Sequence, residues 1–319
     1  RTFPPTRSGS GSLGMTAISR DLELEIWDGM VPVIVTLHRD EVTALEAPEP
    51  FYTSVPRVTF LSAVSNEIIE HFAPSAPMGG GNDSVWFDAD GSPLDWQLPM
   101  GVAFDLHQPQ TLPWPLVVHF TSFPDKVLVR GGGAEQHFYH SLKQGLFLEH
   151  GNSSTAMTLP KDEQSQLWAA LQQHEPLSFC KINRRLKCER PMMIPTRFVK
   201  LDEPCAQIPV PVASPDGEPT TLGTVLEVPR ATPPQRKTPA PSPMQILPLP
   251  LPLPLPPLMP TSTPTSAHQG LLPGATPGSY HACCHGVRLE LDTPVVELWR
   301  ACCFPDHWCY VTIHDASER

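Results

Sequence analysis

Fourteen prolines lie between Pro229 and Pro264, and they include a Leu-Pro alternation from Leu247 to Pro256. Proline fixes its own φ angle and has no backbone N–H, so such a run populates polyproline II and packs neither as sheet nor as helix. A long surface insertion costs a domain little stability, because closure entropy grows slowly with loop length. We therefore expect a disordered insertion over residues 229–280, which interrupts a folded unit built from residues 191–228 and 281–316.

Length and charge narrow the class of protein. A chain of 319 residues has room for roughly two domains. Its 22 basic and 33 acidic side chains give a net charge of −11, which argues against broad binding to nucleic acid. The sequence has no uninterrupted apolar run near the length of a membrane-spanning helix, and no secretory leader is expected. Eight cysteines, including two adjacent pairs, do not resemble a secreted disulfide framework, so a cytoplasmic protein with free thiols is expected.

The first folded unit is expected over residues 22–125, after a disordered extension over residues 1–21. Alternation of Leu and Glu from Leu22 to Ile26 predicts a strand, as do the apolar runs Val31 to Leu37 and Arg57 to Ala63. A helix from Val64 to Phe72 should follow. Next come a hairpin from Trp86 to Trp96 around an Asp-Gly turn, a short helix from Pro99 to Leu106 and a buried strand from Leu116 to Phe120. This order indicates an α+β fold.

Residues 131–190 change character, because apolar residues recur there at helical spacing and Pro160 and Pro176 are placed to begin helices. After this helix-rich region, strands are expected at Met193 to Leu201 and Ile208 to Val212, with a helix at Thr221 to Glu227. Beyond the proline tract we expect a strand from His285, a helix begun by Thr293-Pro294 and a last strand from Trp308 to His314.

Short motifs stand in a fixed order along most of the chain. They are Val31-Pro32, Thr36-Leu37, Pro56-Arg57-Val58, the block Leu112 to Pro124, Gln166-Leu167-Trp168, Ile182-Asn183-Arg184, Ile194 to Phe198, His285-Gly286-Val287, Leu298-Trp299 and Val311-Thr312-Ile313. In this order they resemble the autophagy protein 5 family. The resemblance implies two β-grasp, or ubiquitin-like, domains flanking the helical region. It also places the family's own start near Met15 rather than Arg1.

The resemblance implies a non-catalytic scaffold without a cofactor. Such a scaffold pairs with autophagy protein 12 and autophagy protein 16, and it promotes transfer of autophagy protein 8 from its conjugating enzyme to phosphatidylethanolamine. It would act in autophagosome formation, in the cytoplasm and peripherally at the phagophore assembly site membrane.

Family members carry an acceptor lysine, joined by an isopeptide bond to autophagy protein 12, shortly after the first helix of the middle region. In this chain Thr155 occupies that position, within the segment from His150 to Met157. A hydroxyl cannot form the amide, so three alternatives remain open. The complex is non-covalent, or another lysine such as Lys161 or Lys143 serves, or the alignment is displaced.

Two further groups of side chains invite functional interpretations. Lys181, Arg184, Arg185, Lys187 and Arg190 form a basic cluster, which is either a solvated face or a contact for an acidic partner or for phospholipid headgroups. The potential zinc ligands His281, Cys283, Cys284, His285, Cys302, Cys303, His307 and Cys309 contain no Cys-x-x-Cys pair. No metal site is therefore predicted. A nucleophilic pair of Cys303 with His307 lacks an evident orienting group, and no catalytic residue is expected.

The remaining features leave a rival function. Most of the seven tryptophans should be core residues, with one or two lining a groove for a partner. The Leu-Pro tract could instead make the chain a signalling adaptor that binds SH3-type or WW-type domains. Deletion of Pro229 to Pro264 distinguishes the two hypotheses, because the scaffold predicts retained autophagy and the adaptor predicts lost function.

Overall fold

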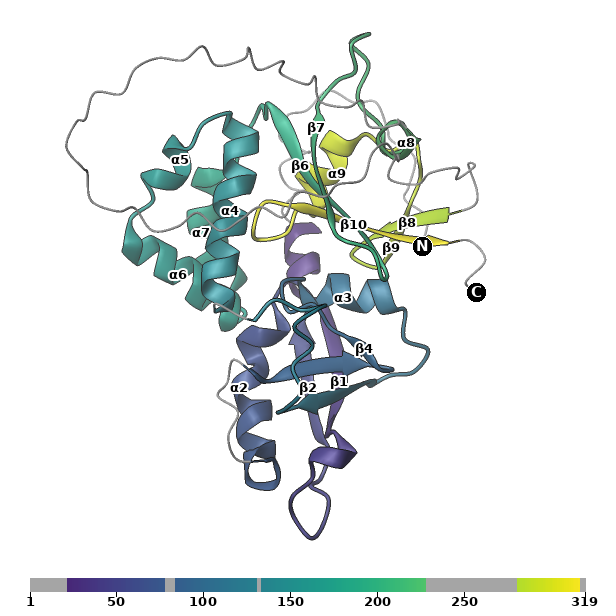
Figure 1. The fold of residues 1–319 in the computed structure, drawn as a ribbon. Helices are drawn as coiled ribbons and strands as arrows, with labels where there is room; N and C mark the ends of the chain where they lie inside the picture. Colours follow the sequence, from purple (N-terminus) through teal and green to yellow (C-terminus); the bar gives the residue numbers. More distant parts are fainter. Residues whose placement is uncertain (1–21, 78–83, 131–132, 228–279, 316–319) are drawn as a thin grey trace, which may run out of the picture.

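Figure 1 shows the computed structural model, in which two β-sheets and a group of helices pack against one another. The structure describes residues 22–77, 84–130, 133–227 and 280–315. Each sheet has five strands, in the order β2-β1-β5-β3-β4 for the first and β7-β6-β10-β8-β9 for the second. In both sheets the central strand runs parallel to the strand that begins the domain, and the other pairings are antiparallel. The expected α+β class with two β-grasp domains is confirmed.

The first sheet encloses one apolar core with its helices. Its strands are β1 (Met30–Leu37), β2 (Phe51–Pro56), β3 (Trp86–Ala89), β4 (Ser92–Pro93) and β5 (Trp114–His119). The helices are α2 (Leu61–Phe72) and α3 (Met100–His107), with 3-10 turns η1 (Arg39–Glu41) and η2 (Ala73–Ser75). Ile68 and Phe72 of α2 pack on Val35 and Val118 in this core. The predicted hairpin is confirmed, because Asp90 and Gly91 take φ values of 52° and 81° between β3 and β4.

Two strands expected at the start of the chain are wrong. Residues 22–27 form a helix, although the alternation from Leu22 to Ile26 suggested a strand. Trp27 decides this, because its buried ring packs on Phe179 of the helical region and draws the segment onto that core. The second strand of the sheet lies at Phe51–Pro56 rather than from Arg57 to Ala63, since Phe51–Pro56 pairs with β1 and the chain turns directly after Pro56.

The helix-rich region contains α4 (Ala134–His150), α5 (Ser154–Met157), α6 (Lys161–Gln172) and α7 (Pro176–Leu186). Phe138, Leu142 and Leu146 lie on one face of α4 and are buried, as their spacing predicted. Pro160 precedes the first residue of α6, and Pro176 is the first residue of α7. Both prolines begin helices as expected, because the first turn does not need their missing N–H.

The second sheet repeats the arrangement of the first. Its strands are β6 (Met193–Lys200), β7 (Ala206–Pro211), β8 (Tyr280–Cys284), β9 (Val287–Leu289) and β10 (Cys309–Asp315), with helices α8 (Leu222–Glu227) and α9 (Val295–Cys302). The prediction that a strand begins at His285 is wrong. His285 and Gly286 form the turn between β8 and β9, with φ values of 50° and 77°. The proline tract and residues 1–21, which include Arg1 and Met15, lie outside the described residues.

Polar contacts join the second domain to its neighbours. Asp105 of α3 pairs with Arg57 and also accepts a hydrogen bond of 2.7 Å from Gly286 N in the β8–β9 turn. On the other side, His307 Nδ1–H donates to Glu149 of α4 over 2.8 Å, and His307 Nε2 lies 2.7 Å from Asn183 Oδ1 of α7. Glu149 and His307 are fully buried. These contacts fix how the three regions are placed.

Candidate functional site

The segment where the acceptor lysine is expected forms a tight turn and a single helical turn. Gly151 ends α4 with a φ of 68°, a conformation that favours glycine, and Met192 packs against its Cα. Asn152 Oδ1 accepts a hydrogen bond from the N–H of Ser154, the first residue of α5. Thr155 lies in α5 and is half-buried, so its hydroxyl stands close to the surface in an ordered turn.

The two substitute lysines are exposed near this segment. Lys161 is the first residue of α6, and Lys143 lies on α4. Lys143 also borders an open groove of about 420 Å³ between α4 and the second sheet, where Phe147, Pro209 and Trp308 supply apolar walls. An exposed amine beside an apolar groove suits an acceptor, because a partner could be held there while the nitrogen reacts.

Exposed apolar side chains gather in and around the segment. Phe147 lies one turn before Gly151, Met157 is in α5 and Met192 covers Gly151, with 50%, 74% and 64% of their surfaces exposed. We call these three residues and the segment 150–161 the acceptor surface. Large exposed apolar residues near one another are typical of a protein-binding surface.

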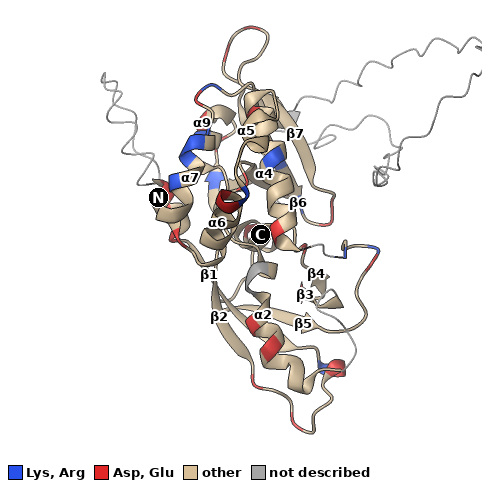
Figure 2. Ribbon diagram, turned by 90° about the vertical axis from the view of Figure 1, so that its left-hand side faces the viewer, with Lys and Arg blue, Asp and Glu red and all other residues tan. Residues whose placement is uncertain are grey.

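The five residues of the basic cluster do not share one helical face. Lys181, Arg184 and Arg185 lie on the exposed side of α7, whereas Lys187 and Arg190 follow the end of that helix. Arg185 pairs with Glu163, and Lys187 Nζ lies 3.2 Å from Glu23. Within the described part of the chain, Lys181, Arg184 and Arg190 make no ion pair. Figure 2 shows basic residues around α7 and α9, whereas α2 of the first domain carries acidic residues.

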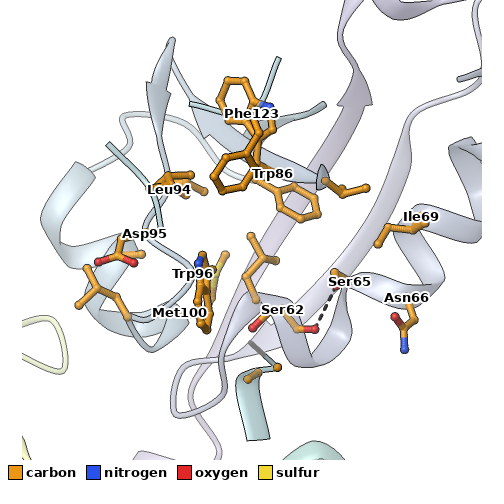
Figure 3. Close-up of a pocket in the computed structure, with 18 residues that line it drawn as sticks. Ser62, Ser65, Asn66, Ile69, Trp86, Leu94, Asp95, Trp96, Met100 and Phe123 are labelled. Atoms are coloured by element: carbon orange, nitrogen blue, oxygen red, sulfur yellow. Dashed lines mark hydrogen bonds between the residues drawn. The ribbon is translucent and has the colours of Figure 1, made fainter. Parts of the chain in front are cut away.

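A deeper cavity of about 210 Å³ opens in the first domain between α2 and the β3–β4 hairpin. Figure 3 shows the rings of Trp86, Trp96 and Phe123 facing Ser62, Ser65, Asn66 and Ile69 of α2 across this cavity. Trp86 and Trp96 are half-buried, whereas the other five tryptophans are core residues with at most 8% exposure. The expectation that one or two tryptophans line a groove agrees with this arrangement.

Cys303 and His307 do not form a nucleophilic pair. Both nitrogens of His307 are engaged by Glu149 and Asn183, which the sequence did not reveal because they lie 158 and 124 positions away. Burial raises the pKa of the Cys303 thiol to about 12, so this thiol is not activated as a thiolate. Cys284 and Cys309 belong to the apolar core of the second domain.

No helix within the described ranges is both long and apolar enough to cross a bilayer.

Three family models match the chain in order. The UblA domain of autophagy protein ATG5 matches residues 26–120, its alpha-helical bundle region matches residues 133–188, and its UblB domain matches residues 191–313. Autophagy protein 5 of Aspergillus fumigatus is 27% identical over 328 residues, which cover 92% of this chain and 94% of that protein. Autophagy protein 5 of Oryza sativa is 35% identical over 174 residues, which cover 53% of this chain and 45% of that protein.

The fold is also found in a solved structure. The crystal structure of Kluyveromyces marxianus Atg5 superposes with a TM-score of 0.69 at 16% sequence identity. The match covers 92% of this chain and 99% of that one. At this identity the likeness concerns the fold, and it agrees with the two sheets and the helices described above.

Proposed function

The chain belongs to the autophagy protein 5 family and has a role in autophagy, and we propose that it acts there as a non-catalytic scaffold. In this proposal it holds autophagy protein 12 on the acceptor surface, binds autophagy protein 16 and promotes lipidation of autophagy protein 8. It works in the cytoplasm and peripherally at the phagophore assembly site membrane. Holding partners close raises their effective concentration, so the chain contributes geometry while its partner enzyme supplies catalysis.

The acceptor surface carries the proposal for autophagy protein 12. Phe147, Met157 and Met192 expose apolar area around the segment where the family's acceptor lies. If the link is covalent, the Nζ of Lys161 or Lys143 attacks the thioester carbon of the activated partner. The C–S bond breaks, the thiol leaves and the nitrogen loses a proton as the amide forms. If it is not covalent, apolar packing on this surface holds the pair.

Co-expression with autophagy protein 12 and its conjugating enzymes tests this proposal. A denaturing gel and mass spectrometry of any shifted band would identify a covalent link and the lysine used. Copurification under native conditions without a shifted band would mean that packing holds the complex. No association in either form would overturn the proposal.

A charge placed on the acceptor surface should weaken the complex. Met157→Asp is the test variant, and Leu177→Asp is its control, because Leu177 of α7 is similarly exposed at 67% but lies outside the acceptor surface. The proposal expects loss of native copurification for Met157→Asp alone. Equal behaviour of the two variants would contradict docking on this surface.

The cavity of the first domain is the proposed contact for autophagy protein 16. Helical partners insert apolar side chains into pockets of this kind, and two tryptophans supply its wall. Asn66→Trp would block the cavity from its exposed rim, whereas Glu67→Trp, an exposed neighbour outside the lining, serves as the control. Autophagy protein 16 should bind the control and not the blocked variant.

The basic cluster is the proposed site of weak membrane contact. Lys181 and Arg184 are exposed and make no ion pair among the described residues, so their charges are available to an anionic surface. Each such residue contributes on the order of 1 kcal/mol near an anionic bilayer. Lys181→Glu combined with Arg184→Glu should reduce sedimentation with phosphatidylserine vesicles. Unchanged sedimentation would leave the cluster as a solvated face.

A further inference from the structure

Three side chains of the second sheet come together on the face opposite its apolar core. His281 and Cys283 lie on β8, and His314 lies on β10. One potential ligand atom from each of them lies within 4.8 Å of the other two. Thirty-one positions separate Cys283 from His314 in the sequence, so only the strand pairing brings them together.

The register explains the cluster. His281 stands directly opposite His314 in the antiparallel β8–β10 pair, and their rings stack at 5.0 Å between centroids. Cys283 follows His281 by two positions and therefore points to the same face. Tyr280, Ala282 and Cys284 point the other way, into the core. Two ligands at i and i+2 with a third directly across a strand pair present a compact set of donors on a rigid support.

We propose that His281, Cys283 and His314 form a zinc-binding site on the second ubiquitin-like domain. Imidazole nitrogen and thiolate sulfur are the donors that Zn²⁺ takes most often in proteins. Their mutual distances require only small side-chain movements, because ligand atoms about 2.0–2.3 Å from a tetrahedral ion lie about 3.3–3.8 Å apart. Three protein ligands leave one position of the ion for a solvent molecule.

The surroundings suit a cation that exchanges with solvent. His281 and Cys283 are half-exposed, so an ion can enter, while His314 is 5% exposed and gives the site a buried wall. Thr312 Oγ1 lies 3.1 Å from His314 Nε2 and orients that ring.

A second cluster of potential ligands in the first sheet does not carry the same inference. His38, Glu41 and His119 also bring ligand atoms within 4.8 Å of one another. There, however, Glu41 accepts hydrogen bonds from Phe120 N and from the Thr121 hydroxyl, and His119 Nε2 lies 2.5 Å from Asp88. Glu41 and His119 are thus already engaged by neighbouring groups outside the cluster, which a metal ion would have to displace.

Cobalt titration of the full chain, freed of metal by dialysis against a chelator, tests the zinc site. We expect thiolate-to-cobalt charge-transfer absorption that saturates at one equivalent and disappears when Zn²⁺ is added. Cys283→Ser should abolish this absorption, and His281→Asn should weaken cobalt binding by at least about tenfold. Both residues are half-exposed, so neither variant depends on rebuilding a core.

Cys205→Ser is the matched control, because Cys205 is another half-exposed thiol of the second domain and lies outside the cluster. It should bind cobalt like the unchanged chain. Zinc should also raise the thermal unfolding midpoint of the unchanged chain and of Cys205→Ser, but not of Cys283→Ser. Absence of the charge-transfer absorption, or its persistence in Cys283→Ser, would overturn the proposal.

Discussion

The two ubiquitin-like domains share a strand order but differ in chemistry at the same place in the sheet. In the first domain His119 of β5 stands opposite Trp86 of β3, and Asp88 follows two positions later. In the second domain His314 of β10 stands opposite His281 of β8, and Cys283 follows two positions later. One backbone arrangement thus places a contacting histidine and aspartate beside an indole ring in one domain and the proposed metal ligands in the other.

In the first domain, contacts among the side chains themselves hold the cluster together. His119 lies 2.5 Å from Asp88, and its ring stacks on Trp86 at 3.8 Å between centroids, so this cluster is closed by its own contacts. The core faces of the two sheets, by contrast, carry equivalent aliphatic residues such as Val118 and Ile313. Packing therefore constrains the inner face in both domains, while the outer face has diverged.

The largest predicted effect breaks the buried contact between the second domain and α4. Glu149→Ala leaves the fully buried His307 without its carboxylate partner, so the free energy of unfolding should fall by about 4 kcal/mol. Urea denaturation measures this loss. The control Glu135→Ala, at an exposed position of the same helix, should change it by less than about 0.5 kcal/mol. Similar losses in both variants would contradict the role of the buried pair.

The next effect separates the two equivalent clusters. Asp88→Ala removes the carboxylate beside the buried His119 and should cost about 3 kcal/mol in the free energy of unfolding. The equivalent change, Cys283→Ala, should cost less than about 1 kcal/mol in the metal-free chain, because that thiol is half-exposed. Urea denaturation of both variants in chelator makes the comparison. Equal losses would show that the clusters do not differ as described.

A smaller effect concerns pH at the contact between the first domain and α4. Burial lowers the pKa of His137, whose ring lies edge-on to Phe60 and Trp96. Since the unfolded chain then binds this proton more readily than the folded chain, stability is lost as pH falls below the unfolded value of about 6.5. His137→Gln should flatten the decline in unfolding free energy between pH 7 and pH 5. The control is His140→Gln, at an exposed position further along α4. It should leave the decline unchanged.

The smallest effect is expected from the proline tract. Deletion of Pro229 to Pro264 should leave native binding of autophagy protein 12 and autophagy activity near those of the full chain, because a scaffold acts through its folded domains. An autophagic flux assay in cells that lack the unchanged chain measures this. Loss of activity with retained folding would favour the signalling adaptor that binds SH3-type or WW-type domains.

Periodicity predicted much of the fold because packing follows it. The apolar spacing of α4 and the Asp90-Gly91 turn each allow one structure only, and both were predicted correctly. The segment from Leu22 to Ile26 allowed two, since its apolar residues suit a strand face or a helix that docks through Trp27. Local pattern cannot decide between them, because the deciding contact is with Phe179, far along the chain.

The candidate sites were less predictable for the same reason. The acceptor segment and Thr155 came from the resemblance to the family, not from any local pattern. The pairing of Glu149 with His307 depends on helix packing. The placement of His314 near Cys283 depends on strand register. The sequence shows which hydrogen-bonding groups and potential metal ligands are present. The distances between them are set only when the chain folds.

Reconstitution of lipidation tests the central claim most directly. Autophagy protein 8, its conjugating enzymes and vesicles that contain phosphatidylethanolamine would be mixed with autophagy proteins 12 and 16, with and without this chain. The scaffold proposal predicts that the chain raises the rate of lipidation, and that Met157→Asp removes the increase while Leu177→Asp retains it. A rate that does not change when the chain is added would contradict the proposal.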